Sequence, residues 1–318
     1  MPRPNVQADL AEAARRVRDD REHGASWLAR QAADALAYAA SAEPDSADSE
    51  SLLRHLHAAV QAFAAARPSM AALANTAARI WSAGAPPTSL LTTSSMPSAE
   101  RLRAIRDEAG QLIALWQEAS VRILDFSRPF LAGTLYTLSR SGTVEQVLVT
   151  LAGESGDGPQ IIVAESRPGG EGIASARALV AAGWRVTLVP DTACALFMPQ
   201  ASAVVVGADS VRADGGVVNK VGTYPLALAA QAHRIPVYVL CETIKIAAPD
   251  FPLVLEEMSP AELLPDPPAG VTVRNPYFDH TPAALVTHIV TERGILSPAE
   301  LNRIAGEAAH NLALLHAS

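Results

Sequence analysis

The chain has 318 residues, of which 49% are hydrophobic, so it is long enough to form roughly two globular domains. Its formal net charge is -8 at pH 7, and the sequence contains no long run of Lys or Arg, which argues against nucleic acid as a direct ligand. The N-terminus lacks the apolar segment of a signal peptide, and no stretch of about 18 apolar residues follows. We therefore expect a cytoplasmic protein that does not enter a membrane.

The first 127 residues predict a helical domain. Ala, Leu, Arg and Glu recur at helical spacing over residues 26–40, 51–81 and 99–124. Clusters of Pro, Ser and Asp interrupt this pattern at residues 41–50 and 82–100, and we expect the second interruption to be a flexible loop.

From residue 128 to residue 318 the pattern changes, because short β-branched runs alternate with helical runs at the spacing of βαβ units. Strands are predicted at residues 133–139, 160–166, 185–190, 203–209, 236–241 and 271–275. Helices are predicted at residues 143–154, 172–183, 191–200, with Asp191 or Thr192 as N-cap, and 219–233. Nearly continuous apolar strands favour a parallel sheet covered on both faces. The predicted fold class is α/β, with an N-terminal helical domain (residues 1–127) followed by a doubly wound parallel sheet (residues 128–318).

In a doubly wound sheet, ligands bind beyond the carboxyl ends of the strands. Asp209 follows the apolar run 203–208, so partial desolvation is expected to raise its pKa and suit it to acid–base chemistry. Asp is also common in turns and caps, and this reading remains open. Arg167 lies beside a Gly-rich turn, and Lys220 lies at an expected helix start, so both would contact an anionic ligand. The alternative for each is a solvated surface cation.

Cofactor and metal chemistry have little support in the sequence. Residues 169–175 read GGEGIAS, but Ser175 stands where a dinucleotide-binding fingerprint needs Gly or Ala. Cys194 and Cys241 lie in apolar runs typical of buried small side chains. The eight histidines have no metal-binding spacing. We therefore expect no cofactor and no metal.

Four stretches carry a resemblance to a known family, and they are ESRPGGEG (165–172), GADSVRADGGVVNKVGTYPLALAA (207–230), NPYFDHTPAALVTHIVTERG (275–294) and, more weakly, ARPSMAALANTAARI (66–80). They resemble the family that joins the alpha, beta and delta subunits of translation initiation factor 2B to ribose-1,5-bisphosphate isomerase and methylthioribose-1-phosphate isomerase. The resemblance implies an N-terminal helical domain, a Rossmann-like C-terminal domain with a ligand pocket, and a homodimer or higher assembly built through the C-terminal domain.

The resemblance also implies roles for particular residues. In the family's isomerases an aspartate and a cysteine catalyse aldose-to-ketose conversion, and Asp209 matches that aspartate. Residues that match phosphate and sugar contacts are Gly24, Ala25, Arg67, Arg167, Asn219 and Lys220, with Lys245 matching a basic residue near the same pocket. Glu171 lies where the isomerases tend to have Gln.

Two departures from the family pattern affect the chemistry. Ser139 stands where the isomerases have the cysteine, and a serine hydroxyl is far less acidic than a thiol with a pKa of about 8.5. His23 stands where they have the arginine of an Arg-Gly-Ala sequence, and Arg21 is a candidate to replace that arginine.

Three functions therefore remain open. The first is an isomerase of a phosphorylated pentose, with Asp209 as general acid–base and Ser139 or water completing the proton relay. The second is a non-catalytic protein that binds a sugar phosphate or nucleotide, and the third is a translation-factor-like regulatory subunit that acts through protein partners. The presence of Asp209, Asn219 and Lys220, which a purely structural descendant would not need, favours ligand binding more than it favours turnover.

Overall fold

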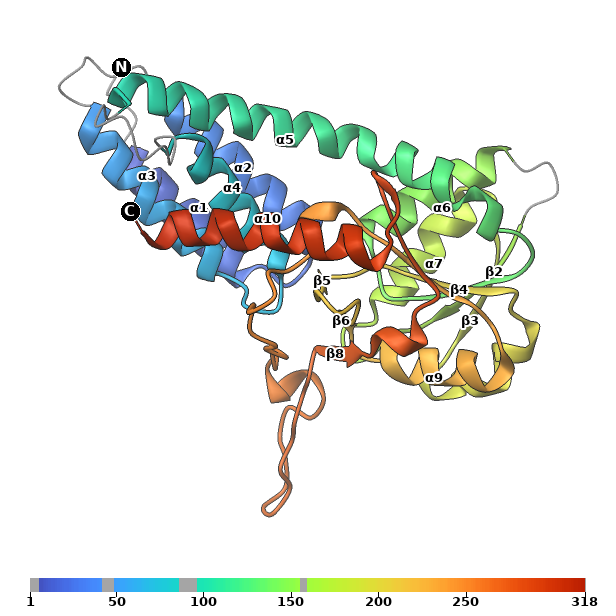
Figure 1. The fold of residues 1–318 in the computed structure, drawn as a ribbon. Coiled ribbons are helices and arrows are strands. Elements are labelled where there is room, and N and C mark those ends of the chain that lie inside the picture. The colour runs from blue at the N-terminus through green and yellow to red at the C-terminus, as the bar shows by residue number, and fades with distance from the viewer. Residues whose placement is uncertain (1–5, 42–48, 86–95, 155–158, 318) are drawn as a thin grey trace.

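The computed structural model describes residues 6–41, 49–85, 96–154 and 159–317. A bundle of helices forms the N-terminal half, and a twisted sheet with helices on both faces forms most of the C-terminal half (Figure 1). Of the loop predicted over residues 82–100, residues 86–95 lie outside the described part, and so do residues 42–48 of the first interruption.

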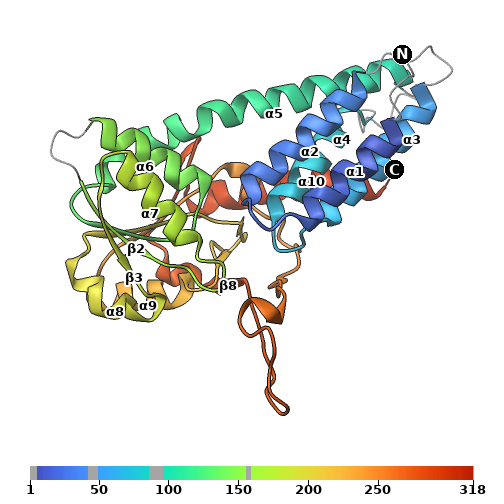
Figure 2. The same ribbon diagram turned by 180° about the vertical axis from the view of Figure 1, so that it is seen from behind.

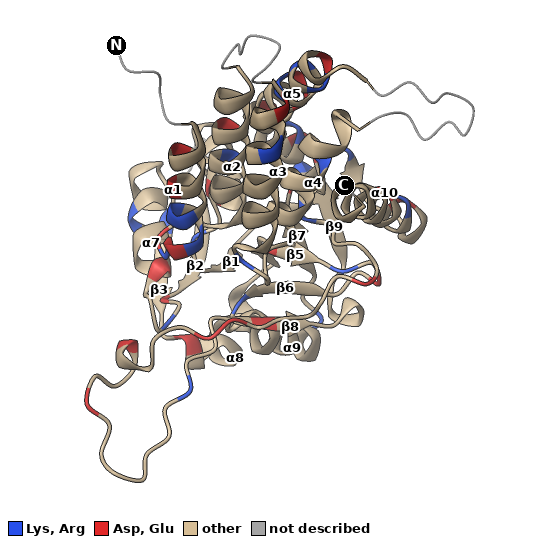
Figure 3. Ribbon diagram, turned by 90° about the vertical axis from the view of Figure 1, so that its left-hand side faces the viewer, with Lys and Arg blue, Asp and Glu red and all other residues tan. Residues whose placement is uncertain are grey.

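The N-terminal half consists of α1 (Val6–Asp19), α2 (Ala25–Ala40), α3 (Ser49–Ala65), α4 (Ala71–Ala83) and α5 (Ser98–Ser127). Their apolar residues recur every three or four positions and meet in one core, in which Leu28, Leu56 and Ile105 are fully buried. Acidic and basic residues are intermixed on α1 (Figure 3). The helical segments predicted from the sequence are confirmed.

The central sheet has the strand order β10-β9-β7-β4-β1-β2-β3. Its strands are β1 (Leu135–Leu138), β2 (Gln160–Ala164), β3 (Arg185–Val189), β4 (Ala203–Val206), β7 (Val237–Leu240), β9 (His288–Thr291) and β10 (Gly294–Ile295). All neighbours pair in parallel except β9 and β10, and β1 pairs with β4. The chain runs outward from β1 in one direction and from β4 in the other, so the topological switch point lies between these two strands.

Helices cover both faces of this sheet, which confirms the predicted α/β class. The core on one face joins the end of α5 to α6 (Gly142–Glu154) and α7 (Glu171–Ala181). The core on the other face includes α9 (Thr223–His233) and the start of α10 (Pro298–His316). Residues 143–154 and 172–183 were predicted as helices, and α6 and α7 confirm both.

The strand predicted at residues 271–275 is wrong. These residues lie in a projecting segment, residues 249–277, which we call the arm (Figures 1 and 2). Within the arm the structure assigns a short helix, η5 (Pro260–Glu262), and a single bridge between Glu257 and Pro276. Residues 271–275 have a β-branched pattern but no neighbouring strand with which to pair, whereas β9, which the sequence reading missed, completes the sheet beside β7.

Two helix predictions also need correction. Asn219 and Lys220 do not begin a helix but end the strand β6 (Val217–Lys220), which pairs with β5 (Ser210–Val211) and with β8 (Phe278–Thr281) in a small antiparallel sheet. Residues 191–200 form three short pieces, η2 (Asp191–Ala193), α8 (Cys194–Phe197) and η3 (Met198–Gln200). Neither Asp191 nor Thr192 is an N-cap there, because Pro190 precedes η2.

The last helix brings the chain back to the N-terminal bundle, since α10 packs against α4 (Figure 1). A capping box at Ser297 and Glu300 begins this helix. In the described part of the chain, no helix combines the length and the apolar character needed to cross a membrane.

Candidate functional site

A cavity of about 340 Å³ lies where the carboxyl ends of β1 and β4 meet the N-terminal helices. This is the switch point of the sheet, where doubly wound folds bind their ligands. The predicted site residues that line the cavity are Gly24, Ala25, Arg67, Ser139, Glu171, Asp209, Asn219, Lys220 and Lys245. Three of these come from the N-terminal half of the chain and six from the C-terminal half, so the site is shared between both.

Arg167 does not lie among the residues that line this cavity. Its side chain is exposed, and its backbone amide donates a hydrogen bond to Asp191 Oδ2 at 2.6 Å. Gly172 is required beside this turn, because a Cβ at this position would lie 1.8 Å from the carbonyl oxygen of Ala164. The start of α7 is therefore packed directly against the end of β2.

Asp209 lies three residues beyond β4 and faces the cavity. Burial raises the pKa of its carboxyl group, while the charges of Lys245 and Arg67 and the Ala25 amide oppose this rise. A raised pKa is the shift that the sequence predicted, because an apolar strand precedes Asp209. The carboxyl group thus combines access to the cavity with a raised pKa, as acid–base chemistry requires.

Ser139 follows β1 in a left-handed backbone conformation, with φ of 60°. Its amide donates to Ser166 Oγ at 2.6 Å, and Ser166 is itself left-handed, with φ of 64°. The Ser166 amide in turn donates to Asp191 Oδ1 at 2.8 Å. Left-handed conformations are unfavourable for residues other than Gly, so these hydrogen bonds hold two strained strand ends side by side at the cavity.

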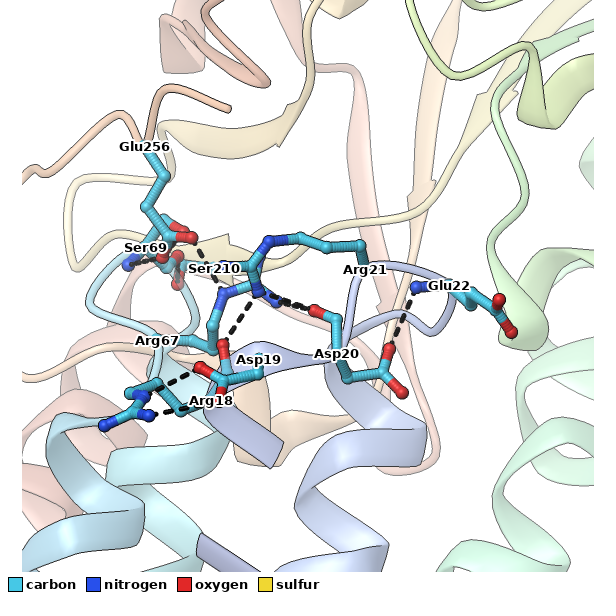
Figure 4. Close-up of polar contacts among 9 residues, drawn as sticks. All are labelled: Arg18, Asp19, Asp20, Arg21, Glu22, Arg67, Ser69, Ser210 and Glu256. Carbon is cyan, nitrogen blue, oxygen red and sulfur yellow. Dashed lines mark hydrogen bonds and ion pairs between the residues drawn. The ribbon is translucent and has the colours of Figure 1, made fainter. Parts of the chain in front are cut away.

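Arg67 lies between α3 and α4 and is buried, with 4% of its surface exposed. Its Nε donates to Glu256 Oε2 of the arm at 2.8 Å, and one terminal nitrogen donates to the Asp20 carbonyl oxygen at 3.0 Å. Arg21 donates to the same carbonyl oxygen at 2.8 Å (Figure 4). Arg67 and Arg21, which both line the cavity, therefore converge on one carbonyl oxygen.

Lys220 is also buried and forms an ion pair with Glu171, with Nζ 2.9 Å from Oε1. The ammonium lies 3.3 Å from the centre of the Tyr277 ring, and the Tyr277 hydroxyl donates to the same Oε1 at 2.9 Å. Burial lowers the pKa of Lys220, whereas the charge of Glu171 opposes the shift. Asn219 donates to Thr223 Oγ1 at 3.0 Å and thereby links β6 to α9.

Lys245 pairs with Glu242, whose carboxylate also accepts from Ser26 at the start of α2 and Thr143 at the start of α6. Burial alone would lower the pKa of Lys245, but Glu242, Cys241 and Asp209 together outweigh burial and raise it. This network fixes the N-termini of two helices beside the cavity.

The sequence reading missed two residues of the site. Tyr277 lies in one of the stretches that carry the resemblance, but the local sequence around it does not indicate a contact with Lys220. Glu256 lies in the arm, 189 positions from Arg67, and no local signal predicts this pairing. Among the described residues, no group of three or more His, Cys, Asp or Glu side chains is placed to hold a metal ion.

Charges of both signs line the cavity. The basic residues are Arg21, Arg67, Arg140, Lys220 and Lys245, and the acidic residues are Glu22, Glu145, Glu171 and Asp209. Glu242 and Glu256 add carboxylates that pair with two of the basic groups. An anionic ligand must therefore compete with carboxylates for each buried cation.

Comparisons with known proteins agree with this architecture. The model of the Initiation factor 2 subunit family matches residues 21–298. Ribose 1,5-bisphosphate isomerase from Archaeoglobus fulgidus is 30% identical over 297 residues, which cover 91% of this chain and 90% of that protein. Methylthioribose-1-phosphate isomerase from Trichoplax adhaerens is 42% identical over 151 residues, or 45% of this chain and 42% of that protein.

A solved structure is also similar. The translation initiation factor eIF-2B of Pyrococcus horikoshii OT3 aligns with a TM-score of 0.74 and 31% identity, covering 90% of this chain and 96% of that chain. The family resemblance inferred from the four sequence stretches is confirmed by these matches.

Proposed function

The chain belongs to the initiation factor 2 subunit family, and from that premise we propose that its cavity binds a phosphorylated pentose and converts the aldose into the ketose. Asp209 moves protons at the sugar carbons, with Ser139 or water completing the relay. The phosphate lies among Arg21, Arg67 and Lys220, close to the N-terminus of α2 at Gly24 and Ala25. Helix N-termini favour anions because their first amides lack partners within the helix.

The observation that carries this proposal is the placement of Asp209. Its carboxyl group stands at the switch point of the sheet, in a cavity that also contains buried cations, and burial raises its pKa. General acid–base catalysis is most efficient when the pKa of the group lies near the working pH. Aldose–ketose conversion needs such a group, because hydrogen must leave one carbon and return to the next.

The test is to incubate the purified protein with ribose 1,5-bisphosphate and with methylthioribose 1-phosphate, and to follow ketose formation by NMR. Asp209→Asn should lower kcat by about 10²–10⁴-fold, the usual contribution of a general acid–base group. Asp34→Asn is the matched control, since burial also raises the pKa of Asp34 but the residue lies on α2 outside the cavity. Absence of ketose with both substrates would contradict the isomerase function.

A second candidate is a protein that binds the sugar phosphate without turning it over. Ser139 favours it, because the hydroxyl cannot supply the proton that a thiol would. In that case the ligand increases the free energy of unfolding by RT ln(1 + [L]/Kd) and so raises the melting temperature, without product. Asp209→Asn would then leave binding intact and have no reaction to abolish.

As part of this proposal, the protein is a cytoplasmic homodimer or higher homo-oligomer assembled through its C-terminal half. The arm supports this assembly, since its side chains at Leu253, Leu255, Leu263, Leu264 and Val271 are 37–50% exposed. Light scattering after size exclusion tests the oligomeric state, and cell fractionation tests the location. A heteromeric role like that of a translation factor predicts that other subunits co-purify from an extract, and a homo-oligomer recovered alone would count against it.

A further inference from the structure

His23 lies in the segment between α1 and α2, where Asp20 holds it in place. Asp20 Oδ1 accepts from the backbone amides of Glu22 at 2.9 Å and His23 at 2.8 Å. Its other oxygen, Oδ2, lies 2.9 Å from His23 Nδ1. The imidazole stacks on the Trp27 indole, with the ring centres 3.7 Å apart and the planes inclined by 14°. Backbone, carboxylate and indole therefore fix both the position and the plane of the imidazole.

This arrangement leaves one ring nitrogen available to a ligand. Nδ1 is engaged by Asp20, and among the described residues Nε2 has no hydrogen-bond partner. The ring lines the same cavity as Ser139 and Asp209. A carboxylate on Nδ1 fixes the tautomer in which Nε2 accepts a proton, and it stabilises the imidazolium that then forms.

We propose that His23, oriented by Asp20, is the second acid–base group of the site and carries the protons that Ser139 cannot. This inference rests on the proposed isomerase function. As the bond between C1 and the ring oxygen breaks, the His23 imidazolium donates its proton to that oxygen. It later takes the proton of the C2 hydroxyl as the C2 carbonyl forms, while Asp209 moves the hydrogen from C2 to C1 as a proton. His23 thus ends the cycle protonated, as it began.

An imidazole suits this role better than the hydroxyl of Ser139. Its ordinary pKa of about 6.5 lets it both donate and accept near neutral pH, whereas a serine hydroxyl does neither without a base beside it. The permanently charged arginine that the family resemblance places here cannot carry protons. The change to His23 therefore adds proton transfer at the same position in a chain that has lost the cysteine.

Charged groups of both signs surround His23. Besides Asp20, the cavity wall presents Arg21 and Glu22 from the same segment, Arg67 from the α3–α4 turn, Arg140 and Glu145 after β1, Glu171, Asp209, Lys220 and Lys245. Signs are mixed over this wall, and the side chain of His23 is 39% exposed, so solvent also reaches the ring. The group is open to proton exchange with water between turnovers.

The experiment compares His23→Asn with wild type and with His57→Asn. The Asn side-chain nitrogen can still donate to Asp20, but it cannot titrate. His57 is the matched control, because it also stacks on an indole, that of Trp81, with ring centres 4.6 Å apart, but lies outside the cavity. Ketose formation is followed by NMR from pH 5.5 to pH 9, which gives kcat and KM separately.

We expect His23→Asn to lower kcat by about 10²–10⁴-fold, to change KM by less than about threefold, and to change the shape of the pH profile of kcat, because Asn cannot transfer a proton. Asp20→Asn should also lower kcat, but by a smaller factor, since the carboxylate no longer stabilises the imidazolium. Unchanged kcat and pH profile in His23→Asn would overturn the role. A raised KM with unchanged kcat would overturn it also, because His23 would then be a ligand contact.

The outcomes separate this inference from the function on which it rests. A wild-type protein with no turnover overturns the isomerase function and the role of His23 together, whereas active wild type with an equally active His23→Asn overturns the role alone. If His23→Asn fails to fold, the imidazole NMR signals of the wild-type protein decide. The signal of His23 should move when ribose 1,5-bisphosphate is added, and a signal that stays in place under saturating ligand would overturn the role.

Discussion

Glu171→Gln should make the cavity bind anions more tightly, although Glu171 is itself part of the cavity wall. Glu171 Oε1 accepts from both Lys220 Nζ and the Tyr277 hydroxyl at 2.9 Å, and a glutamine oxygen can accept from both in the same way. The substitution therefore removes a negative charge while it preserves the shape and the hydrogen bonds of the cluster. Lys220 then keeps its position but no longer has a counterion.

The expected gain follows from the distance between charges. A phosphate oxygen bound on the opposite side of the Lys220 ammonium would lie about 6 Å from Glu171 Oε1, twice the 2.9 Å of the present ion pair. At an effective dielectric constant of about 20, two unit charges 6 Å apart repel by about 3 kcal/mol. Solvent reaches the Glu171 side chain, which is 24% exposed, and screening reduces this repulsion. We therefore expect Kd to fall by roughly 10–100-fold.

The free protein should lose stability in the same variant. Lys220 is 4% exposed, and a buried ion pair that loses one charge leaves the other uncompensated. Because Gln still accepts a hydrogen bond, we expect a loss of about 1–3 kcal/mol rather than the 3–5 kcal/mol seen when a buried pair is broken outright. Burial lowers the pKa of Lys220 and Glu171 opposes this shift, so the substitution should lower that pKa further. The gain in affinity should then decrease as the pH rises through the pKa of Lys220.

Calorimetric titration with inorganic phosphate and with ribose 1,5-bisphosphate, at pH 7 and pH 9, measures these effects. Glu12→Gln is the matched control, since Glu12 pairs with Arg15 on the exposed surface of α1, and its Kd should equal that of wild type. If Glu171→Gln binds phosphate no more tightly than wild type at pH 7, Glu171 does not oppose the anion and the charge argument is wrong.

Three further predictions concern stability and assembly. Burial raises the pKa of Asp279 to about 6, so its contribution to stability is full below pH 3.8 and is lost as the pH rises through 6. Asp279→Asn should accordingly melt at a higher temperature than wild type at pH 8 but not at pH 3.5, and equal shifts at both would contradict it. Ser297→Ala removes the cap of α10 and should reduce the free energy of unfolding by about 0.5–2 kcal/mol in a denaturant titration. Leu255→Glu should shift the protein toward monomers in light scattering, and an unchanged mass would exclude this part of the arm from the interface.

The centre of the sheet could be predicted because its strands are buried on both faces. Each of β1, β2, β4 and β7 is an apolar run of four or five residues, and such runs are recognisable without knowledge of their neighbours. Because these strands run parallel, their carboxyl ends lie at one edge of the sheet. Asp209 and Ser139 could therefore be assigned to a common site from the sequence and the family resemblance.

The elements that depend on distant partners could not be predicted. β6 pairs with β8, some 60 residues further along the chain, and this pairing makes a strand of Asn219 and Lys220 where local propensity favoured a helix. The segment at residues 271–275 shows the opposite case, since its β-branched residues have no partner strand. Arg167 is predicted as a phosphate contact, and its side chain lies outside the residues that line the cavity.

The cations of the site were recognisable, but their pairing was not. Lys220, Arg67 and Lys245 each hold a carboxylate, from α7, from the arm and from the end of β7 respectively. Anion binding is therefore an exchange in which phosphate replaces a carboxylate, and the affinity depends on the difference between two strong interactions. Of the three carboxylates, Glu242 is also held by two helix starts, because Ser26 and Thr143 donate to it.

Glu256 differs from the other two carboxylates because it lies on the arm. It accepts from Arg67 and from both the amide and the hydroxyl of Ser69, so the pairing ties the arm to the turn between α3 and α4 (Figure 4). A phosphate that takes Arg67 must weaken this attachment. Occupancy of the cavity and the position of the arm are therefore thermodynamically linked. The same arm carries the exposed leucines, to which a partner could bind. By reciprocity, a partner that holds the arm in place changes the affinity for phosphate by the same factor by which phosphate changes the affinity for that partner.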